Sequence, residues 1–308
     1  MNSQLHRTPL TDLGVLRIGG ADAGRFLQGQ VSNDLERLSP ERTLLAGYHS
    51  PQGRTIALLR LVAIAEDELL ALLPRELVTL VRDRLAKYVL RAKVTLTDVS
   101  AEWRISALAP AEHLASGTPA GLAPQGLAAE PGECTRIESR RYLCIGAAPA
   151  RWLEIAAADQ TPSEPSPAAC QEWRLLDVRA GFTQVYAATS EHFVAQMLNL
   201  DALDAIAFDK GCYTGQEVIA RAHYRGRVKR RAQRLRSREP LVLAPGASGV
   251  LSDGRAFEVL DSAQLPDGRA EFLAVTALPD AAPVERTEQA EAVRLEVEPL
   301  ALPYALEP

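Results

Sequence analysis

The chain has 308 residues, of which 47% are apolar and 24% charged, and this is the composition of a folded protein of about two domains. Glycine and proline, 20 of each, show no G-X-Y period, so a collagen is excluded, and the apolar share excludes wholesale disorder. The 34 basic and 39 acidic residues give a net charge of −5. This charge gives no reason to expect attraction of the whole surface to nucleic acid or anionic lipid.

The sequence shows no targeting segment. The N-terminus has neither the basic and apolar regions of a signal peptide nor the pattern of a transit peptide. The most apolar run, Ile56–Ala65, is broken by Arg60 and falls short of the roughly 18 residues of a membrane span. The four cysteines form no C-x-x-C pair and the five histidines no H-x-x-x-H pair, so neither a disulfide framework nor a metal centre is predicted. We expect a cytoplasmic protein without direct membrane contact.

Residues 1–100 are predicted to form a small α+β unit of the ferredoxin-like kind. Apolar periodicity and turn residues place its elements. In chain order these are a strand at Leu13–Ile18, a helix at Ala21–Gln30, strands at Arg54–Ala65 and Leu69–Leu73, a helix at Arg75–Leu90 and a strand at Lys93–Val99. The order strand, strand, helix, strand of the last four is typical of such a unit.

Two further regions are predicted to follow. Residues 101–233 form a second α+β region, which can interleave with the first, and residues 234–308 form a β-barrel. The second region is expected to contain strands at Trp103–Ala109, Tyr142–Ala147 and Trp152–Ala157, a linker at Asp159–Pro167 and a helix at Glu172–Arg179. The barrel is expected to contain strands at Leu241–Leu243, Gly249–Leu251, Phe257–Leu260, Phe272–Leu278 and Val293–Val297.

The densest group of chemically useful residues lies at Phe208–Arg221. Thr214 and Glu217 form a T-x-x-E capping box, which predicts a helix that begins directly after Thr214, with Cys212 in the preceding turn. The partial positive charge of a helix N-terminus and the nearby Lys210 would favour the reactive thiolate form of Cys212. The alternative is an ordinary buried cysteine in a capped turn.

A basic stretch continues from this helix. Arg221–Arg238 holds nine basic residues and no acidic one, which predicts an anion site for phosphate, carboxylate or RNA. The alternative is a solvated strand edge. Tyr224 is the one aromatic residue interleaved with these cations, so the stacking platform of a single-strand binder is missing. A small carboxylate or polyanion therefore fits better than a nucleic acid.

Phe208–Arg231 resembles the K-G-C-Y-x-G-Q-E signature of the YgfZ family, folate-binding and iron–sulfur-related proteins that are similar to the glycine-cleavage T-protein, an aminomethyltransferase. Further segments resemble motifs of the same family in the same order. They are Phe26–Asp34 (FLQGQVSND), Ser50–Arg54 (SPQGR), Leu90–Val94 (LRAKV) and Arg179–Leu200, which contains R-x-G and T-x-E-x-F-x-x-Q-x-x-N-L. Two positions depart from the family: Gln52 stands in place of a lysine and Ala195 in place of a proline.

The resemblance implies a T-protein-like ring of three domains, with ferredoxin-like α+β units and a C-terminal β-barrel, around a central hole that binds tetrahydrofolate or a derivative. It implies a factor that supports the assembly or repair of iron–sulfur enzymes, with clients such as a radical-type tRNA methylthiotransferase. The essential cysteine of the family corresponds to Cys212, which is also a candidate for a transient metal ligand, and Lys210 is the second catalytic candidate. Their motif neighbours are Gly211, Tyr213, Gly215, Gln216 and Glu217.

The resemblance also implies folate contacts. The Asn33–Asp34 turn and the segment Glu191–Asn199 are expected to face the central hole, where polar side chains can pair with the amide-like edge of a pterin ring. Arginines of the basic stretch can hold the glutamate tail. The candidates are Asn33, Asp34, Glu191, Gln196 and Asn199 for the pterin and Arg221 and Arg225 for the tail.

Two other functions stay open. A folate-dependent C1 or aminomethyl transferase is the enzyme alternative, but Gly53–Leu58, the stretch that corresponds to an aspartate pair of the T-protein, has no carboxylate. A tRNA-binding module built on Arg221–Arg238 is the third, and the net acidity and the single aromatic argue against direct binding of nucleic acid. Whether Cys212 acts as a nucleophile, a redox thiol or a metal ligand is also open.

Overall fold

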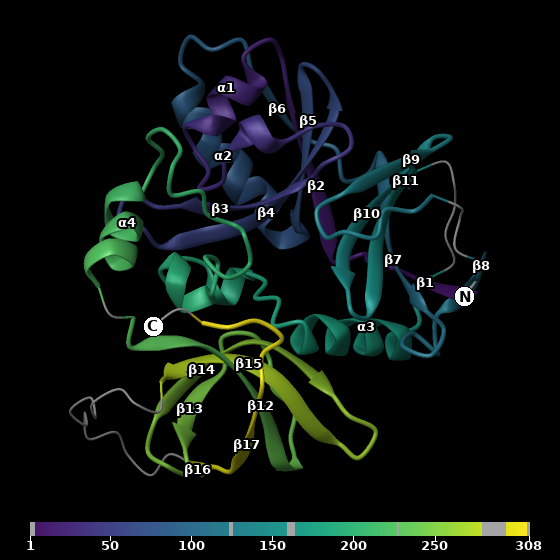
Figure 1. Cartoon of the computed structure of the whole chain (residues 1–308), viewed down its shortest axis with the longest axis vertical. Helices are drawn as coiled ribbons and strands as arrows, with labels where there is room; N and C mark the ends of the chain where they lie inside the picture. The colour runs from purple at the N-terminus through teal and green to yellow at the C-terminus, as the bar shows by residue number, and fades with distance from the viewer. Residues whose placement is uncertain (1–3, 123–125, 159–163, 227, 279–293, 307–308) are drawn as a thin grey trace.

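The computed structural model describes residues 4–122, 126–158, 164–226, 228–278 and 294–306. Three β-sheets surround a common centre, with helices packed on their faces (Figure 1). The predicted α+β class is confirmed. No helix in the part of the chain that the structure describes is long and apolar enough to cross a membrane.

The first sheet is a ferredoxin-like unit with one added strand. Its order is β3-β4-β5-β2-β6, and all neighbours are antiparallel. Without β3, the chain order β2-α1-β4-β5-α2-β6 is the βαββαβ order of this motif. The elements are β2 (Leu13–Gly19), α1 (Ala23–Gln28), η1 (Leu35–Arg37), β3 (Leu44–His49), β4 (Thr55–Ala65), β5 (Glu68–Pro74), η2 (Arg75–Leu77), α2 (Val78–Val89) and β6 (Thr95–Asp98).

The second sheet has the order β8-β1-β7-β11-β10-β9. Its strands are β1 (Gln4–Pro9), β7 (Trp103–Pro110), β8 (Thr118–Leu122), β9 (Cys134–Ile137), β10 (Arg140–Ala147) and β11 (Ala150–Ala157). Because β1 belongs here, the chain starts in the second sheet, crosses to the first and returns. Helix α3 (Pro167–Arg179) follows, and its N-terminus has the Ser166 side chain as acceptor for the Ala169 N–H, with Pro167 in the first turn.

The third sheet curls upon itself. Its order is β16-β13-β14-β15-β12-β17, and its two edge strands, β16 (Arg294–Leu295) and β17 (Val297–Leu300), are separated in sequence by one residue, Glu296. One chain segment therefore supplies both edge strands. The sheet is curled in the manner of a small barrel. The other strands are β12 (Arg230–Pro240), β13 (Ser248–Leu251), β14 (Ala256–Gln264) and β15 (Arg269–Ala277).

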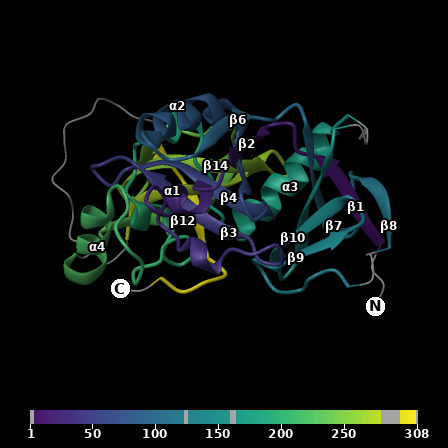
Figure 2. The same cartoon turned by 90° about the horizontal axis from the view of Figure 1, so that it is seen from above.

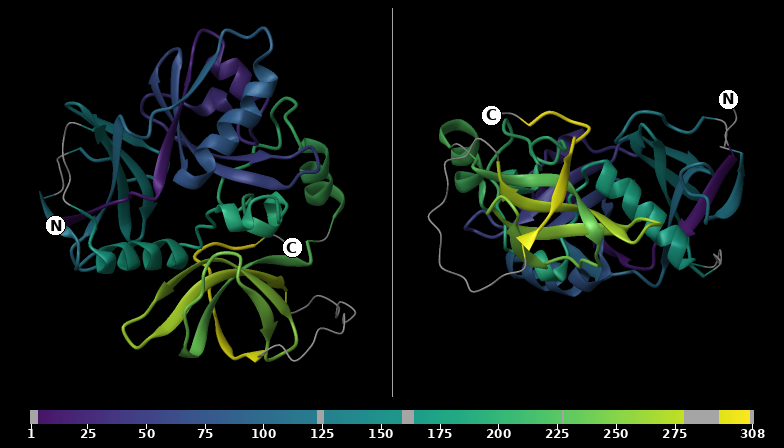
Figure 3. Two further views of the ribbon diagram at one scale, coloured as in Figure 1. Left: turned by 180° about the vertical axis from the view of Figure 1, so that it is seen from behind. Right: turned by 90° about the horizontal axis from the view of Figure 1, so that it is seen from below.

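The segment between α3 and the barrel contains η3 (Ala187–Thr189), η4 (Ala195–Leu198) and α4 (Gln216–Arg225). It lies between the first sheet and the barrel (Figure 1). Seen from above and from behind, α4 lies at one end of the molecule and the second sheet at the other (Figures 2 and 3). Backbone hydrogen bonds tie the segment to the first sheet, from the Thr55 N–H to the Phe193 carbonyl (2.8 Å) and from the Ala207 N–H to the Ser32 carbonyl (2.9 Å).

The predicted elements of both α+β regions are found within a few residues, with α1 shorter and α3 longer than predicted. The strand predicted at Leu241–Leu243 is wrong, because Pro240 and Pro245 flank it too closely for a ladder to form. Residues 159–163 of the predicted linker and Val293 of the last predicted strand lie outside the described residues. Strands β1, β3, β8, β9 and β12 were not among the predictions.

Candidate functional site

The two glycine-containing motif turns pack directly against each other. Gly53 and Gly215 both have positive φ, +72° and +83°, a conformation that suits glycine. A Cβ on Gly215 would lie 2.6 Å from the Ser50 carbonyl oxygen, and one on Gly53 would lie 2.7 Å from the Val218 Cβ. The close approach of these two turns therefore requires glycine at both positions, and it sets where α4 begins.

The predicted capping box is wrong. The N-cap residue of α4 is Gly215, one position after Thr214, and no side chain caps the helix. The reason is the contact with the Ser50–Gly53 turn, which needs left-handed backbone at this position, so glycine takes the place of a capping side chain. Gln216 is half-buried and Glu217 is exposed in the first turn.

Lys210 is held inside the protein by backbone carbonyls. Its Nζ donates hydrogen bonds to the carbonyl oxygens of Gln28 (2.8 Å), Val31 (2.8 Å) and Asn33 (2.7 Å), and it lies 5.2 Å from the centre of the Tyr213 ring. Burial lowers the pKa of Lys210 to about 8. All three ammonium protons have acceptors, so Lys210 joins the start of the K-G-C-Y motif to the FLQGQVSND segment, and its predicted catalytic role is untested.

Cys212 is exposed, whereas Cys134 and Cys144 are buried. Its thiol makes no hydrogen bond with a described residue, and a Cβ built on the neighbouring Gly211 would meet no atom within 4 Å. The next residue, Tyr213, is buried and anchors the turn. The alternative of an ordinary buried cysteine is therefore wrong: the turn is fixed on one side and open at the thiol.

The predicted pterin contacts have internal partners. Asn33 donates to the carbonyls of Leu45 (2.8 Å) and Asp204 (2.7 Å) and accepts from the Asp34 N–H (2.8 Å). The hydrogen bond from Gln28 lowers the pKa of the Asp34 carboxyl. These groups brace the turn that Lys210 binds.

The second group of predicted contacts is held in the same way. Arg84 donates to the Glu191 carboxylate (2.6 Å) and thereby lowers the pKa of that group. The Gln196 Nε2 donates to the Ile219 carbonyl (2.7 Å), and the Asn199 Nδ2 donates to the Ala232 carbonyl (2.9 Å). Gln196 is 1% exposed, and its Oε1 has no partner among the described residues. Whether any of these groups contacts folate is untested.

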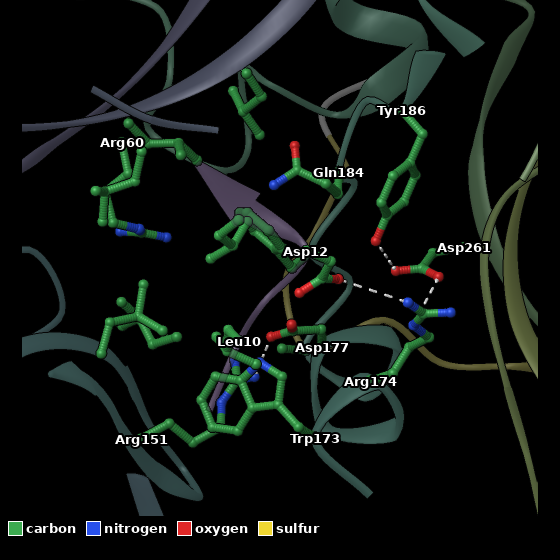
Figure 4. Close-up of a pocket in the computed structure, with 18 of the residues that line it drawn as sticks. Leu10, Asp12, Arg60, Arg151, Trp173, Arg174, Asp177, Gln184, Tyr186 and Asp261 are labelled. Atoms are coloured by element: carbon green, nitrogen blue, oxygen red, sulfur yellow. Dashed lines mark hydrogen bonds and ion pairs between the residues drawn. The ribbon is translucent and has the colours of Figure 1, made fainter. Parts of the chain in front are cut away.

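A separate cavity of about 320 Å³ lies where the three sheets meet (Figure 4). It is lined by Leu58 and Arg60 of β4, Arg151 of β11, the α3 residues Trp173, Arg174 and Asp177, and Asp261 of β14, among others. None of the predicted site residues lines it. Its lining could not be found from motifs, because it comes from many short segments that are distant in sequence.

Most of the charged side chains that line the cavity have a partner of opposite charge. Arg151 and Asp177 form an ion pair (2.5 Å), and Tyr186 donates to Asp261 (3.0 Å). Arg174 lies 3.6 Å from the Asp261 carboxylate. Burial raises the pKa of Asp261 to about 7 and exceeds the opposing effect of Arg174, so this carboxyl exchanges a proton near neutral pH.

Two donor groups face the cavity without a partner among the described residues. The Arg60 guanidinium lies 5.8 Å from the Phe182 ring centre and makes no ion pair there, and burial lowers its pKa to about 10. The Gln184 side chain accepts from the Val185 N–H through its oxygen, which leaves its amide nitrogen free. Figure 4 shows both side chains extending into the cavity. The cavity therefore offers hydrogen-bond donors to a ligand with acceptor or anionic groups.

Comparison with known proteins gives the family. The tRNA-modifying protein YgfZ of Serratia proteamaculans is 32% identical over 276 residues, which cover 84% of this chain and 80% of that protein. The chain belongs to the YgfZ family. The tRNA-modifying protein YgfZ of Cronobacter sakazakii is 30% identical over an alignment of 331 positions, gaps included, that covers 98% of this chain and 95% of that protein. No family model matches the chain.

The solved structures give the fold. The glycine cleavage system aminomethyltransferase T from Bartonella henselae matches with a TM-score of 0.65 and 13% identity, over 90% of this chain and 79% of that one. The T-protein-like fold predicted from the YgfZ motifs is confirmed.

The first prediction concerns the three hydrogen bonds from Lys210 to backbone carbonyls, called here the Lys210 clamp. Lys210→Met keeps the length of the side chain but leaves three buried carbonyls without a donor, so we expect the free energy of unfolding to fall by about 3 kcal/mol. Urea denaturation at pH 7 measures it. Lys229→Met is the control, because Lys229 is exposed and its side chain has no partner among the described residues. Equal stability of the two variants would show that the clamp is not structural.

The second prediction concerns His49, which is buried beneath the motif turns with its ring 6.4 Å from that of Tyr213. Burial lowers the pKa of His49 to about 3, so between pH 6.5 and 3 the unfolded chain binds a proton that the folded protein does not. Stability falls as the pH drops through this window, with up to about 1.4 kcal/mol per pH unit from this group. In His49→Gln we expect a correspondingly shallower loss between pH 6 and 4.5 in urea titrations. Parallel curves for the two proteins would contradict the assignment.

Proposed function

We propose that this protein is a folate-binding factor that supports assembly or repair of iron–sulfur enzymes, including those that methylthiolate tRNA, through a reactive Cys212. The observation that carries the proposal is the exposed thiol on a turn fixed by Lys210, Tyr213 and Gly215. The relatives' name, tRNA-modifying protein, supports the link to tRNA modification.

A single exposed thiol suits transfer between proteins. Iron–sulfur clusters are commonly held by four thiolates, so one cysteine in an open turn leaves most ligand positions to a partner protein. The same accessibility permits a mixed disulfide with a client cysteine. Both routes need a thiol that a macromolecule can reach, and both are lost without the sulfur.

We propose that tetrahydrofolate binds in the cavity where the three sheets meet. Its volume of about 320 Å³ is that of a small-molecule pocket. The free donors of Arg60 and Gln184 match the carbonyl, ring nitrogen and carboxylate acceptors of a folate, and the buried Arg151 Nε has no partner among the described residues. We propose that Arg60 and Gln184 hold the ligand there. A bound tetrahydrofolate supplies a one-carbon carrier.

The alternative is a tetrahydrofolate-dependent aminomethyl or C1 transferase. One observation favours it: Asp261 lines the cavity, is hydrogen-bonded by Tyr186, and has a pKa raised to about 7 by burial. A group with that pKa can act as a general acid or base near neutral pH. In a transferase this carboxyl, and not Cys212, would be essential.

The third prediction tests Cys212 in cells that lack this protein. Resupply with wild type restores methylthiolated tRNA nucleosides, measured by mass spectrometry, whereas Cys212→Ala and Cys212→Ser leave them at the level of the empty vector. Cys144→Ala is the control, since that thiol is buried in the second sheet, and all variants are compared at equal abundance. Full rescue by Cys212→Ala would exclude the thiolate function and favour the transferase.

The fourth prediction tests the folate site. Arg60→Gln removes a charged donor from the cavity, so we expect tetrahydrofolate binding, measured by calorimetry, to weaken about 10-fold to 100-fold. Arg221→Gln is the matched control, because Arg221 is exposed on α4 and does not line the cavity. Weaker binding by Arg221→Gln and unchanged binding by Arg60→Gln would place the folate tail at α4, as the sequence predicts.

A further inference from the structure

The basic stretch divides into a paired half and an unpaired half. In and near β12, Arg231 pairs with Asp201, Arg234 and Arg236 pair with Glu271, and Arg238 pairs with Glu296. On α4, between α4 and β12, and at the first residue of β12, four cations form no ion pair and no side-chain hydrogen bond with a described residue. They are Arg221, Arg225, Lys229 and Arg230, and Arg227 lies outside the described residues.

Aromatic rings gather beside the unpaired cations. Phe208 and His223 stack with their ring centres 3.8 Å apart and an angle of 14° between planes. Tyr224 meets both edge to face, at 6.2 Å and 4.7 Å, and is 67% exposed. The sequence showed one interleaved aromatic, but the fold adds Phe208 from before the helix, so the objection that no stacking platform exists does not hold.

The cations and the exposed ring share one face of a fixed helix. Arg221, Tyr224 and Arg225 are spaced i, i+3 and i+4, which puts them side by side on the helix surface. On the opposite side Ile219 is buried and its carbonyl accepts from Gln196. The face is therefore exposed and rigid, at the outer end of the molecule (Figures 1 and 2).

We infer that the exposed face of α4 binds single-stranded RNA such as the loop of a hairpin. This face, called here the α4 surface, is made of Arg221, Tyr224 and Arg225, with the rings of Phe208 and His223 in contact with Tyr224. Lys229 and Arg230 follow it in the chain. Cations that track phosphates and a ring that stacks on a base are the two elements of sequence-tolerant single-strand binding. An acidic protein would use the same cations, so the stacking of a base on Tyr224 is the property that the test must separate from charge. The inference goes beyond the proposed function and does not rest on it.

The acidic net charge does not oppose local binding. At about 0.1 M salt the screening length is about 10 Å, so an RNA at α4 responds to the charges around it and not to the total of −5. Within α4 itself Glu217 is the one carboxylate, against two arginines and the cations that follow. The local balance is positive.

The fifth prediction separates stacking from charge. The probe is a fluorescein-labelled RNA hairpin of about 20 nucleotides with an unpaired loop, and its anisotropy is followed with the full-length protein over a range of KCl concentrations. Tyr224→Ala weakens binding about tenfold through lost stacking and leaves the salt dependence unchanged. The double variant Arg221→Gln/Arg225→Gln weakens binding and also lowers the slope of log K against log salt by about 1.4, because each lost phosphate contact removes about 0.7.

Two controls and two contrary outcomes complete the test. Arg136→Gln, on β9 at the other end of the molecule, binds as wild type, and Arg140→Gln, on β10 of the same sheet, is the second control. If the arginine variant weakens binding and Tyr224→Ala does not, the attraction is unspecific counterion release and the inference is overturned. If neither variant changes the affinity, the α4 surface does not bind RNA and the inference is overturned in favour of a protein partner.

Discussion

The arrangement of the motif region depends on one half-buried charge, that of Lys210. The Lys210 ammonium is taken from water and held by the carbonyls of Gln28, Val31 and Asn33. A buried charge costs free energy unless it is fully hydrogen-bonded, and the three acceptors are supplied by a loop that only the folded first unit presents. The position of the turn that carries Cys212 therefore depends on that loop. Because burial disfavours the charged form, the pKa of Lys210 is lowered to about 8.

The cavity and the turn that carries Cys212 are separate places in the fold. The cavity lies where the three sheets meet and contains Arg60 and Asp261, whereas Cys212 stands on an exposed turn beside α4. The chain between them is short: Leu203 lines the cavity and Lys210 begins the motif.

The sequence predicted the regular elements well, because apolar periodicity decides which face of a strand or helix is buried, as in Arg75–Leu90 and α2. It could not predict contacts between segments. The capping box at Thr214 and Glu217 is locally sound, and the approach of the Ser50–Gly53 turn overrides it. The cavity could not be predicted for the same reason. In the sequence Arg60 only interrupts an apolar strand, and the segments that form the cavity around it are distant in the chain.

The division of the basic stretch shows how burial sorts charges that look alike in sequence. Glu271 is fully buried and takes Arg234, Arg236 and the α3 residue Arg179, because a buried carboxylate without partners would be strongly destabilising. The cations of α4 face solvent, where water satisfies them and an ion pair would add little. The ion pairs of β12 therefore stabilise the fold. The positive charge of the unpaired cations is not needed for folding. Their charge is available for a ligand, and the exposed ring of Tyr224 beside them favours one that stacks.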